Sequence, residues 1–263
     1  MSTRSRTPSI AELRAVTQPP EIFARNSGEH WAGRLYIRRL SPYLTRLLLR
    51  TPITPNGVTW LMILAGIAAA AVLTLPGVWP AVAAVVLIQL QILLDCSDGE
   101  LARWTERRSP VGVYLDRLGH WLTEAALPIG LGIRADGGWE HLGGWTSIGL
   151  LLAVISLVVK GEGALVHIAR LESGLAKVAD TAATAAPARA GLARVRSLLS
   201  FAPFFRVFVA MEFTLLALAA AIGDEIAGDL DVTRGVLVAL IPITAIVAAG
   251  RLVAILTSAR LRA

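Results

Sequence analysis

The chain has 263 residues, of which 55% are hydrophobic and 17% are charged, and its mean hydropathy is +0.62. This balance is too apolar for an ordinary soluble domain, so we expect an integral membrane protein. The net charge of +6 does not indicate nucleic-acid binding, because the basic residues gather between the apolar segments. The single cysteine, Cys96, excludes an internal disulfide, and we interpret it as an apolar packing residue.

The N-terminal part of the chain divides into two segments before the first long apolar run. Residues 1–27 contain arginines and two adjacent prolines but no apolar run followed by a cleavage site, so we expect a mobile cytoplasmic tail without a secretory signal. Residues 28–56 follow, and between 31 and 50 apolar residues and arginines alternate at helical spacing. That pattern is typical of an amphipathic helix in the membrane interface. The stretch TPITPNGVT then predicts a turn, with Asn56 or Thr59 capping the next helix.

Residues 57–263 are predicted to form one transmembrane catalytic domain. Six apolar segments in it are each near the length that crosses a hydrocarbon core of about 30 Å. They cover residues 58–75, 80–103, 111–133, 145–168, 203–223 and 233–256. The third segment is the least hydrophobic, but its charges cluster in its first half, where a water-filled vestibule would reach them. We therefore predict an all-α membrane protein, with six transmembrane helices preceded by an N-terminal amphipathic interfacial helix.

The basic residues predict the orientation of these segments. All but two of the 25 lysines and arginines fall on one side of a six-span arrangement, the exceptions being Arg134 and Arg234. By the positive-inside rule, both termini and the candidate site then face the cytoplasm, in an integral protein of the cytoplasmic (inner) membrane. The one long connection, around residues 172–200, is rich in alanine and lacks apolar periodicity, so we expect a flexible cytoplasmic loop.

Acidic residues within apolar segments mark the candidate site. The carboxylates of Asp95, Asp98 and Asp116 would each cost roughly 2.5 to 3.5 kcal/mol in a membrane unless something compensates them. On a helix, Asp95 and Asp98 share one face, and Asp116 and His120 share one face of the next helix. Two antiparallel spans joined by a tight turn would aim these faces at each other. Such a cluster of hard ligands suits Mg²⁺ or Mn²⁺, which also bind substrate phosphates.

An eight-position pattern over residues 95–120 resembles the signature of the CDP-alcohol phosphotransferase family. It reads Asp95-x2-Asp98-Gly99-x2-Ala102-Arg103-x8-Gly112-x3-Asp116-x3-His120. The usual last member of the signature is a fourth Asp, and this chain has His120 there. The stretch TPITPNGVT is also similar to the family's entry to its first span, so the resemblance covers residues 31–256.

The resemblance implies the transfer of a substituted phosphate from a CDP-alcohol to an acceptor hydroxyl, with release of CMP, in phospholipid or polar phosphodiester biosynthesis. It implies two divalent ions, Mg²⁺ or Mn²⁺, held by Asp95, Asp98, Asp116 and His120. His120 would act with Asp116 in catalysis, as the general base or as a metal ligand. The nucleotide would contact Asp95, Asp98, Gly99, Ala102, Arg103 and Gly112. An acceptor phosphate or head group would dock near Lys160 and Arg206.

Several alternatives are open at this stage. Because the fourth Asp is missing, the chain is either an active enzyme or a catalytically degenerate relative. A membrane transporter would also explain intramembrane acids, but not the spacing of the aspartates and small residues. The donor is either a polar CDP-alcohol such as CDP-inositol or a lipid such as CDP-diacylglycerol. As partners we expect membrane lipids and, from the resemblance alone, a second copy of the chain in a homodimer, but no nucleic acid.

Overall fold

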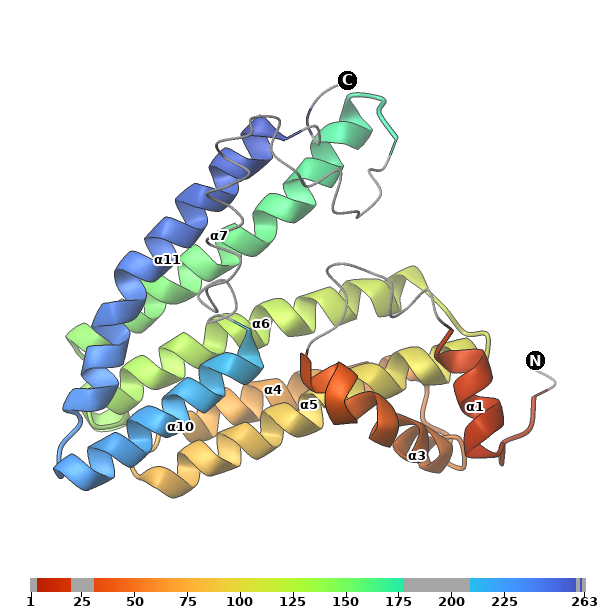
Figure 1. The fold of residues 1–263 in the computed structure, drawn as a ribbon, viewed down its shortest axis with the longest axis horizontal. Coiled ribbons are helices and arrows are strands. Elements are labelled where there is room, and N and C mark those ends of the chain that lie inside the picture. The colour runs from red at the N-terminus through yellow and green to blue at the C-terminus, as the bar shows by residue number, and fades with distance from the viewer. Residues whose placement is uncertain (1–3, 20–30, 177–208, 259–260, 262–263) are drawn as a thin grey trace. The chain divides into compact units, whose positions relative to one another are not determined.

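The computed structural model of the chain describes residues 4–19, 31–176, 209–258 and 261. These residues form helices, and they contain no strand (Figure 1). They divide into two compact units, the first made of residues 1–68 and 86–123 and the second of residues 69–85 and 124–263. The predicted all-α fold class is therefore confirmed.

Six helices of the described residues overlap the six predicted apolar segments, and residues 203–208 of the fifth segment lie outside the described residues. The helices are α4 (Pro55–Leu73), α5 (Val78–Trp104), α6 (Pro110–Ala135), α7 (Gly144–Glu172), α10 (Ala210–Ala227) and α11 (Asp231–Thr257). Within the described ranges, four of them are long and apolar enough to cross a membrane, namely α4, α5, α7 and α11. These four support an integral membrane protein. That α6 and α10 also span the membrane stays a prediction.

The start of α4 is set by a hydroxyl residue followed by proline. Thr54 Oγ1 accepts a hydrogen bond from the Gly57 N–H at 3.1 Å, which satisfies one of the free donors of the first turn. Pro55 suits the first helical position, because the N–H that it lacks would have no partner there. The predicted caps, Asn56 and Thr59, lie inside α4 instead. That prediction was wrong because it placed the helix start too late.

The N-terminal segment contains a helix, α1 (Ile10–Thr17). A capping box starts it, since Ser9 Oγ accepts from the Glu12 N–H at 3.2 Å and the Glu12 carboxylate accepts from the Ser9 N–H at 2.7 Å. Leu13 is fully buried in the core of the first unit, against side chains that include Val58, Met62, Leu101 and Trp104. The segment that was expected to be a mobile tail thus includes a packed helix. Its residues 20–27 lie outside the described residues.

Two further elements, η1 (Gly33–Ile37) and α3 (Arg38–Leu48), occupy the segment predicted as the interfacial helix. The buried side of α3 carries polar side chains, Ser41 and Thr45. Three of its large apolar side chains are 50%, 59% and 58% exposed, namely Leu40, Tyr43 and Leu47. Two further leucines, Leu44 and Leu48, are partly buried against the core of the first unit. The exposed apolar side chains on the other side of α3 are suited to an apolar surrounding. The location of α3 in a membrane interface stays a prediction.

Glycines bring α4 and α6 close together in the first unit. A Cβ atom on Gly66 would lie 2.0 Å from Thr123 Oγ1, and one on Gly119 would lie 2.4 Å from Met62 Cε. Gln91 of α5 joins this contact, because its Nε2 donates to Thr123 Oγ1 at 2.8 Å. In a membrane the hydrophobic effect does not drive helices together, and small residues allow them to pack by close approach.

In the second unit, α7 and α11 run side by side and α10 packs on α11 (Figure 1). Arg134, near the end of α6, is fully buried there. Its Nη1 donates to the carbonyls of Leu75 and Gly77 at 2.8 and 2.9 Å, and its Nη2 lies 3.7 Å from Asp224 Oδ2. Arg134 therefore ties the turn after α4 and the helix α10 to the end of α6.

Asp136, in the loop after α6, caps the start of α7. Its carboxylate accepts hydrogen bonds from the Thr146 hydroxyl at 2.6 Å, the Thr146 and Gly143 N–H groups at 2.8 Å, and the Trp145 N–H at 3.4 Å. Burial by itself would raise the pKa of this carboxyl, but the four hydrogen bonds outweigh it and lower the pKa below its ordinary value. The ionised form of Asp136 is therefore the one that stabilises the fold.

We expect Gly66→Ala to destabilise the protein, because the new methyl group would overlap the Thr123 hydroxyl. Overpacking of this kind costs about 1 to 3 kcal/mol. Gly250→Ala in α11 is the matched control, since a Cβ atom there meets nothing within 4 Å. Thermal unfolding in detergent, followed by circular dichroism, should show a lower midpoint for Gly66→Ala only. Equal midpoints for the two variants would contradict the close packing of α4 and α6.

We also expect Asp136 to make stability depend on pH. Because its folded-state pKa is lowered, its contribution to the free energy of unfolding is complete above its ordinary pKa of 3.8 and is lost as the pH falls through the folded value. Asp136→Asn should lose about 1 kcal/mol at pH 7, the typical worth of a helix cap, and should decline less steeply below pH 4. Unfolding midpoints at pH 7 and pH 3 test this. A variant whose midpoints parallel those of the native chain would refute it.

Candidate active site

Two helices of the first unit carry the predicted site. The helix α5 contributes Asp95 and Asp98, and α6 contributes Asp116 and His120. The turn between them is short. Like α4, α6 begins at a proline, Pro110, which follows a hydroxyl residue, Ser109. Ser109 Oγ accepts a hydrogen bond from the Gly112 N–H at 3.0 Å. The turn and this cap fix the register in which α6 returns along α5.

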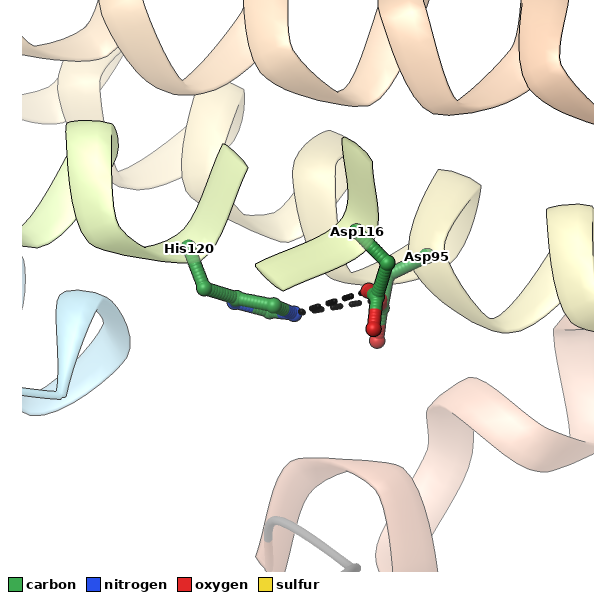
Figure 2. A group of neighbouring side chains, drawn as sticks. All are labelled: Asp95, Asp116 and His120. Carbon is green, nitrogen blue, oxygen red and sulfur yellow. Dashed lines mark hydrogen bonds and ion pairs between the residues drawn. The ribbon is translucent and has the colours of Figure 1, made fainter. Parts of the chain in front are cut away.

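Asp95, Asp116 and His120 converge on one point (Figure 2). His120 Nε2 lies 3.1 Å from Asp95 Oδ1 and 3.5 Å from Asp116 Oδ1. One ligand atom from each of the three residues lies within 4.8 Å of the other two. The side chains are 30%, 43% and 39% exposed in the order Asp95, Asp116, His120, so a ligand can reach them.

The predicted ligand Asp98 has a different partner. It is only 9% exposed, and its Oδ2 accepts a hydrogen bond from Thr59 Oγ1 of α4 at 2.6 Å. In the described part of the chain, three of the four predicted metal ligands therefore form the cluster. A metal-binding role for Asp98 stays a prediction.

The three converging side chains fit a divalent cation. Neighbouring ligand atoms in an octahedral shell of radius about 2.1 Å are roughly 3 Å apart. The separations of 3.1 and 3.5 Å between His120 Nε2 and the two carboxylate oxygens are of this size. Two carboxylate oxygens with one imidazole nitrogen form a softer donor set than four carboxylates. The set therefore suits Mn²⁺ better than an all-aspartate site would.

The glycines of the signature make room for polar side chains. A Cβ atom on Gly99 would lie 3.1 Å from Arg103 Nη1, so the guanidinium of Arg103 occupies the space beside Gly99. A Cβ atom on Gly112 would lie 3.0 Å from Asn56 Oδ1. Both glycines thus permit a close approach within the first unit. Nucleotide binding stays a prediction for the residues Gly99, Ala102, Arg103 and Gly112.

Glu100, which was not predicted from the sequence, is fully buried beside the signature residues. Its Oε1 accepts from Ser41 Oγ at 2.5 Å and from Gln18 Nε2 at 2.8 Å, and its Oε2 accepts from Thr45 Oγ1 at 2.7 Å. Arg38 Nη1 lies 3.9 Å from Glu100 Oε1. Glu100 therefore ties α3 and the end of α1 to α5. The available signal was an acid in an apolar span together with two hydroxyl residues one turn apart on the amphipathic helix.

The predicted acceptor-binding residues are not part of this cluster. Lys160 lies in the second unit, where its Nζ is 2.6 Å from Glu124 Oε2. Arg206 and most of the loop predicted at 172–200 lie outside the described residues. Acceptor binding by Lys160 and Arg206 stays a prediction.

The model of the family named CDP-alcohol phosphatidyltransferase matches residues 52–260, which include both helices of the site. The chain belongs to this family. The membership confirms the resemblance found in the sequence and makes the protein a membrane transferase, in a family that uses divalent metals, CDP-alcohol donors and alcohol acceptors. No curated protein sequence matches the chain closely.

Replacement of one cluster carboxylate should weaken metal binding. We expect Asp116→Asn to reduce the affinity for Mn²⁺ by on the order of tenfold or more, because a charged ligand becomes a neutral amide. Glu140→Gln is the matched control, since Glu140 is an exposed acid outside the cluster. Titration with MnCl₂, followed by the electron paramagnetic resonance of free Mn²⁺, measures the affinity. Equal affinities for the two variants would remove Asp116 from the metal site.

Proposed function

We propose that this family member transfers a substituted phosphate from a CDP-alcohol to an acceptor hydroxyl and releases CMP. One observation carries the proposal: Asp95, Asp116 and His120 converge from two helices at the spacing of the family signature. These residues lie within the region that the family model matches. The cluster is half-exposed, so a diphosphate can reach it.

The reaction forms one bond to phosphorus and breaks another. The acceptor oxygen bonds to the phosphorus that carries the donor's alcohol, and the bond from that phosphorus to the oxygen of CMP breaks. Asp95, Asp98 and Asp116 would hold the divalent ions, Mg²⁺ or Mn²⁺. When bound, such ions neutralise charge on the phosphoryl oxygens and on the leaving CMP. The chain's own residues must orient the diphosphate and take the hydroxyl proton.

We propose that His120 is the general base that accepts the proton of the acceptor hydroxyl. An imidazole is a suitable base near neutral pH. The Nε2 atom of His120 lies within 3.5 Å of both Asp95 and Asp116, so their carboxylates would stabilise the imidazolium that forms. A nitrogen that is bound to a metal cannot accept a proton. The base role and the ligand role of Nε2 are therefore separable by experiment.

The second candidate is a catalytically inactive relative, because His120 replaces the last acid of the signature. Three features favour an active enzyme. His120 faces the two aspartates, the small residues of the signature are present, and the cluster is accessible. A transporter is disfavoured by the family membership.

We further propose that the protein spans the cytoplasmic membrane six times, with its site on the cytoplasmic side. Six spans, a cytoplasmic site and a cytoplasmic-membrane location are supported by the basic residues, of which all but Arg134 and Arg234 fall on one side. The apolar side chains exposed on α3 support its position in the interface. Membrane lipids would thus contact the spans and α3, while the homodimer rests on the family resemblance alone.

The substrates can be assigned by a direct assay. Purified protein would be given CDP-inositol or CDP-diacylglycerol, each with inositol phosphate, glycerol phosphate or inositol as acceptor, in the presence of Mg²⁺ or Mn²⁺. The combination that releases CMP identifies donor and acceptor. If no combination of donor and acceptor releases CMP, the result favours the inactive relative.

We expect His120→Ala to abolish alcohol-dependent CMP release and to change the affinity for CMP and for Mn²⁺ less than twofold. Loss of a general base typically lowers turnover by about 10² to 10⁴-fold. His120→Asp restores the usual acid of the family and should retain turnover, because a carboxylate can also accept the proton of the hydroxyl.

The measurements are CMP release by chromatography and metal affinity by titration. Unchanged turnover in His120→Ala would rule out the base role. A tenfold or greater loss of Mn²⁺ affinity in that variant would assign His120 as a metal ligand instead.

A further inference from the structure

We propose that the N-terminal segment, residues 4–18, completes a phosphate-binding pocket around Arg103 at the end of α5. The ligand is a phosphate group, carried either by the donor nucleotide or by an anionic lipid. The inference extends the proposed function, since Arg103 is one of the residues that the family signature places near the nucleotide. It concerns residues outside the signature, namely Arg4, Thr17 and Arg108.

The first residues of the segment dock on the last turn of α5. Arg4 Nη1 donates to the carbonyls of Arg103 and Trp104 at 3.0 and 3.2 Å, and its guanidinium lies 5.6 Å from the centre of the Trp104 ring. In return, Trp104 Nε1 donates to the Ser5 carbonyl at 2.9 Å. A cation on the free carbonyls of a helix end is favourable, because they carry the negative end of the helix dipole.

The end of α1 holds the Arg103 side chain from the other direction. Arg103 Nε donates to the Thr17 carbonyl at 2.6 Å. The next residue, Gln18, donates to the Glu100 carboxylate at 2.8 Å and to the Arg38 carbonyl at 2.9 Å, which fixes this stretch of chain on α5 and α3. With Nε held, the guanidinium plane of Arg103 is set by the N-terminal segment.

A cavity of about 320 Å³ opens against this guanidinium, and it is lined by Arg4, Val16, Arg103, Glu106 and Arg108. Its volume is at the lower end of the range for small-molecule sites, about 300 to 1,000 Å³. Three of the five lining residues are arginines and one is an acid, Glu106, whose Oε1 lies 3.1 Å from Arg4 Nη2. The lining thus carries a net positive charge.

Planar guanidinium groups that face one cavity favour a multiply charged oxyanion. Arginine presents five N–H donors and binds phosphate oxygens in a bidentate manner. The three arginines come from three segments: Arg4 from the N-terminus, Arg103 from α5 and Arg108 from the turn before α6. An anion in the cavity would offset the repulsion between these like charges. The chemistry therefore selects a phosphate group over a neutral ligand.

The test compares two neighbouring arginines of one turn. Arg108 lines the cavity and Arg107 does not, yet both are exposed, so Arg108→Gln and Arg107→Gln remove the same charge at nearly the same place. Arg4→Gln is the third variant, because it removes the arginine that the N-terminal segment supplies. Each full-length protein is placed in phosphatidylcholine nanodiscs. One arm measures CMP binding with MnCl₂ by calorimetry, and the other measures association of spin-labelled phosphatidylglycerol against spin-labelled phosphatidylcholine.

We expect Arg108→Gln and Arg4→Gln to weaken one of the two probes by about tenfold, the size of one lost charge-assisted hydrogen bond. Arg107→Gln should change that probe less than twofold. An effect in the CMP arm assigns the pocket to the donor, and an effect in the lipid arm assigns it to a lipid head group.

Two outcomes would overturn the pocket: equal effects of Arg108→Gln and Arg107→Gln in both arms, or no binding of either probe by the unaltered protein. Absence of CMP release from every donor would instead count against the proposed transferase activity. The difference between the two variants in the lipid arm would still report on the pocket in that case.

Discussion

An ionised carboxylate among apolar helices is stable only where hydrogen bonds or an opposite charge replace the water that it has lost. The acids of α5 have polar partners on different segments of the first unit. Asp98 is bonded by Thr59 of α4, Glu100 by hydroxyls of α3, and Asp95 faces His120 of α6. Because each acid contacts a different element, α5 connects α3, α4 and α6 to one another.

The way in which each acid is compensated separates anchors from the reactive site. Glu100 is fully buried, and both of its carboxylate oxygens accept hydrogen bonds, so it is a structural anchor. Asp95 and Asp116 are half-exposed and share one imidazole nitrogen. Two negative charges whose ligand atoms lie within 4.8 Å of each other attract a cation more strongly than either does alone. The unequal burial of these acids therefore supports Asp95 and Asp116 as the candidate reactive site, independently of any family signature.

Local patterns predicted the helices well and their distant partners poorly. Hydropathy located the long helices, and helical spacing predicted that Asp95, Asp116 and His120 converge, because both depend on residues that are close in sequence. The partners of Glu100 lie 55 to 82 positions away, so no periodicity within α5 can report them. The helix α1 was missed for a related reason. It is only 8 residues long, and its stability comes from burying Leu13 in a core built by other segments.

The histidine at position 120 changes the charge of the site as well as its proton chemistry. In the usual signature, four carboxylates balance the four positive charges of two divalent ions. In this chain three carboxylates remain, and only Asp95 and Asp116 are in the cluster with His120. With Asp95, Asp98 and Asp116 as the proposed ligands, a second ion would therefore lack one of its two balancing protein charges until the donor diphosphate supplied it. Binding of that ion and of the nucleotide would then be coupled, because each stabilises the other's charge. Under the proposed function, His120 would thus alter how the site assembles without removing the means to assemble it.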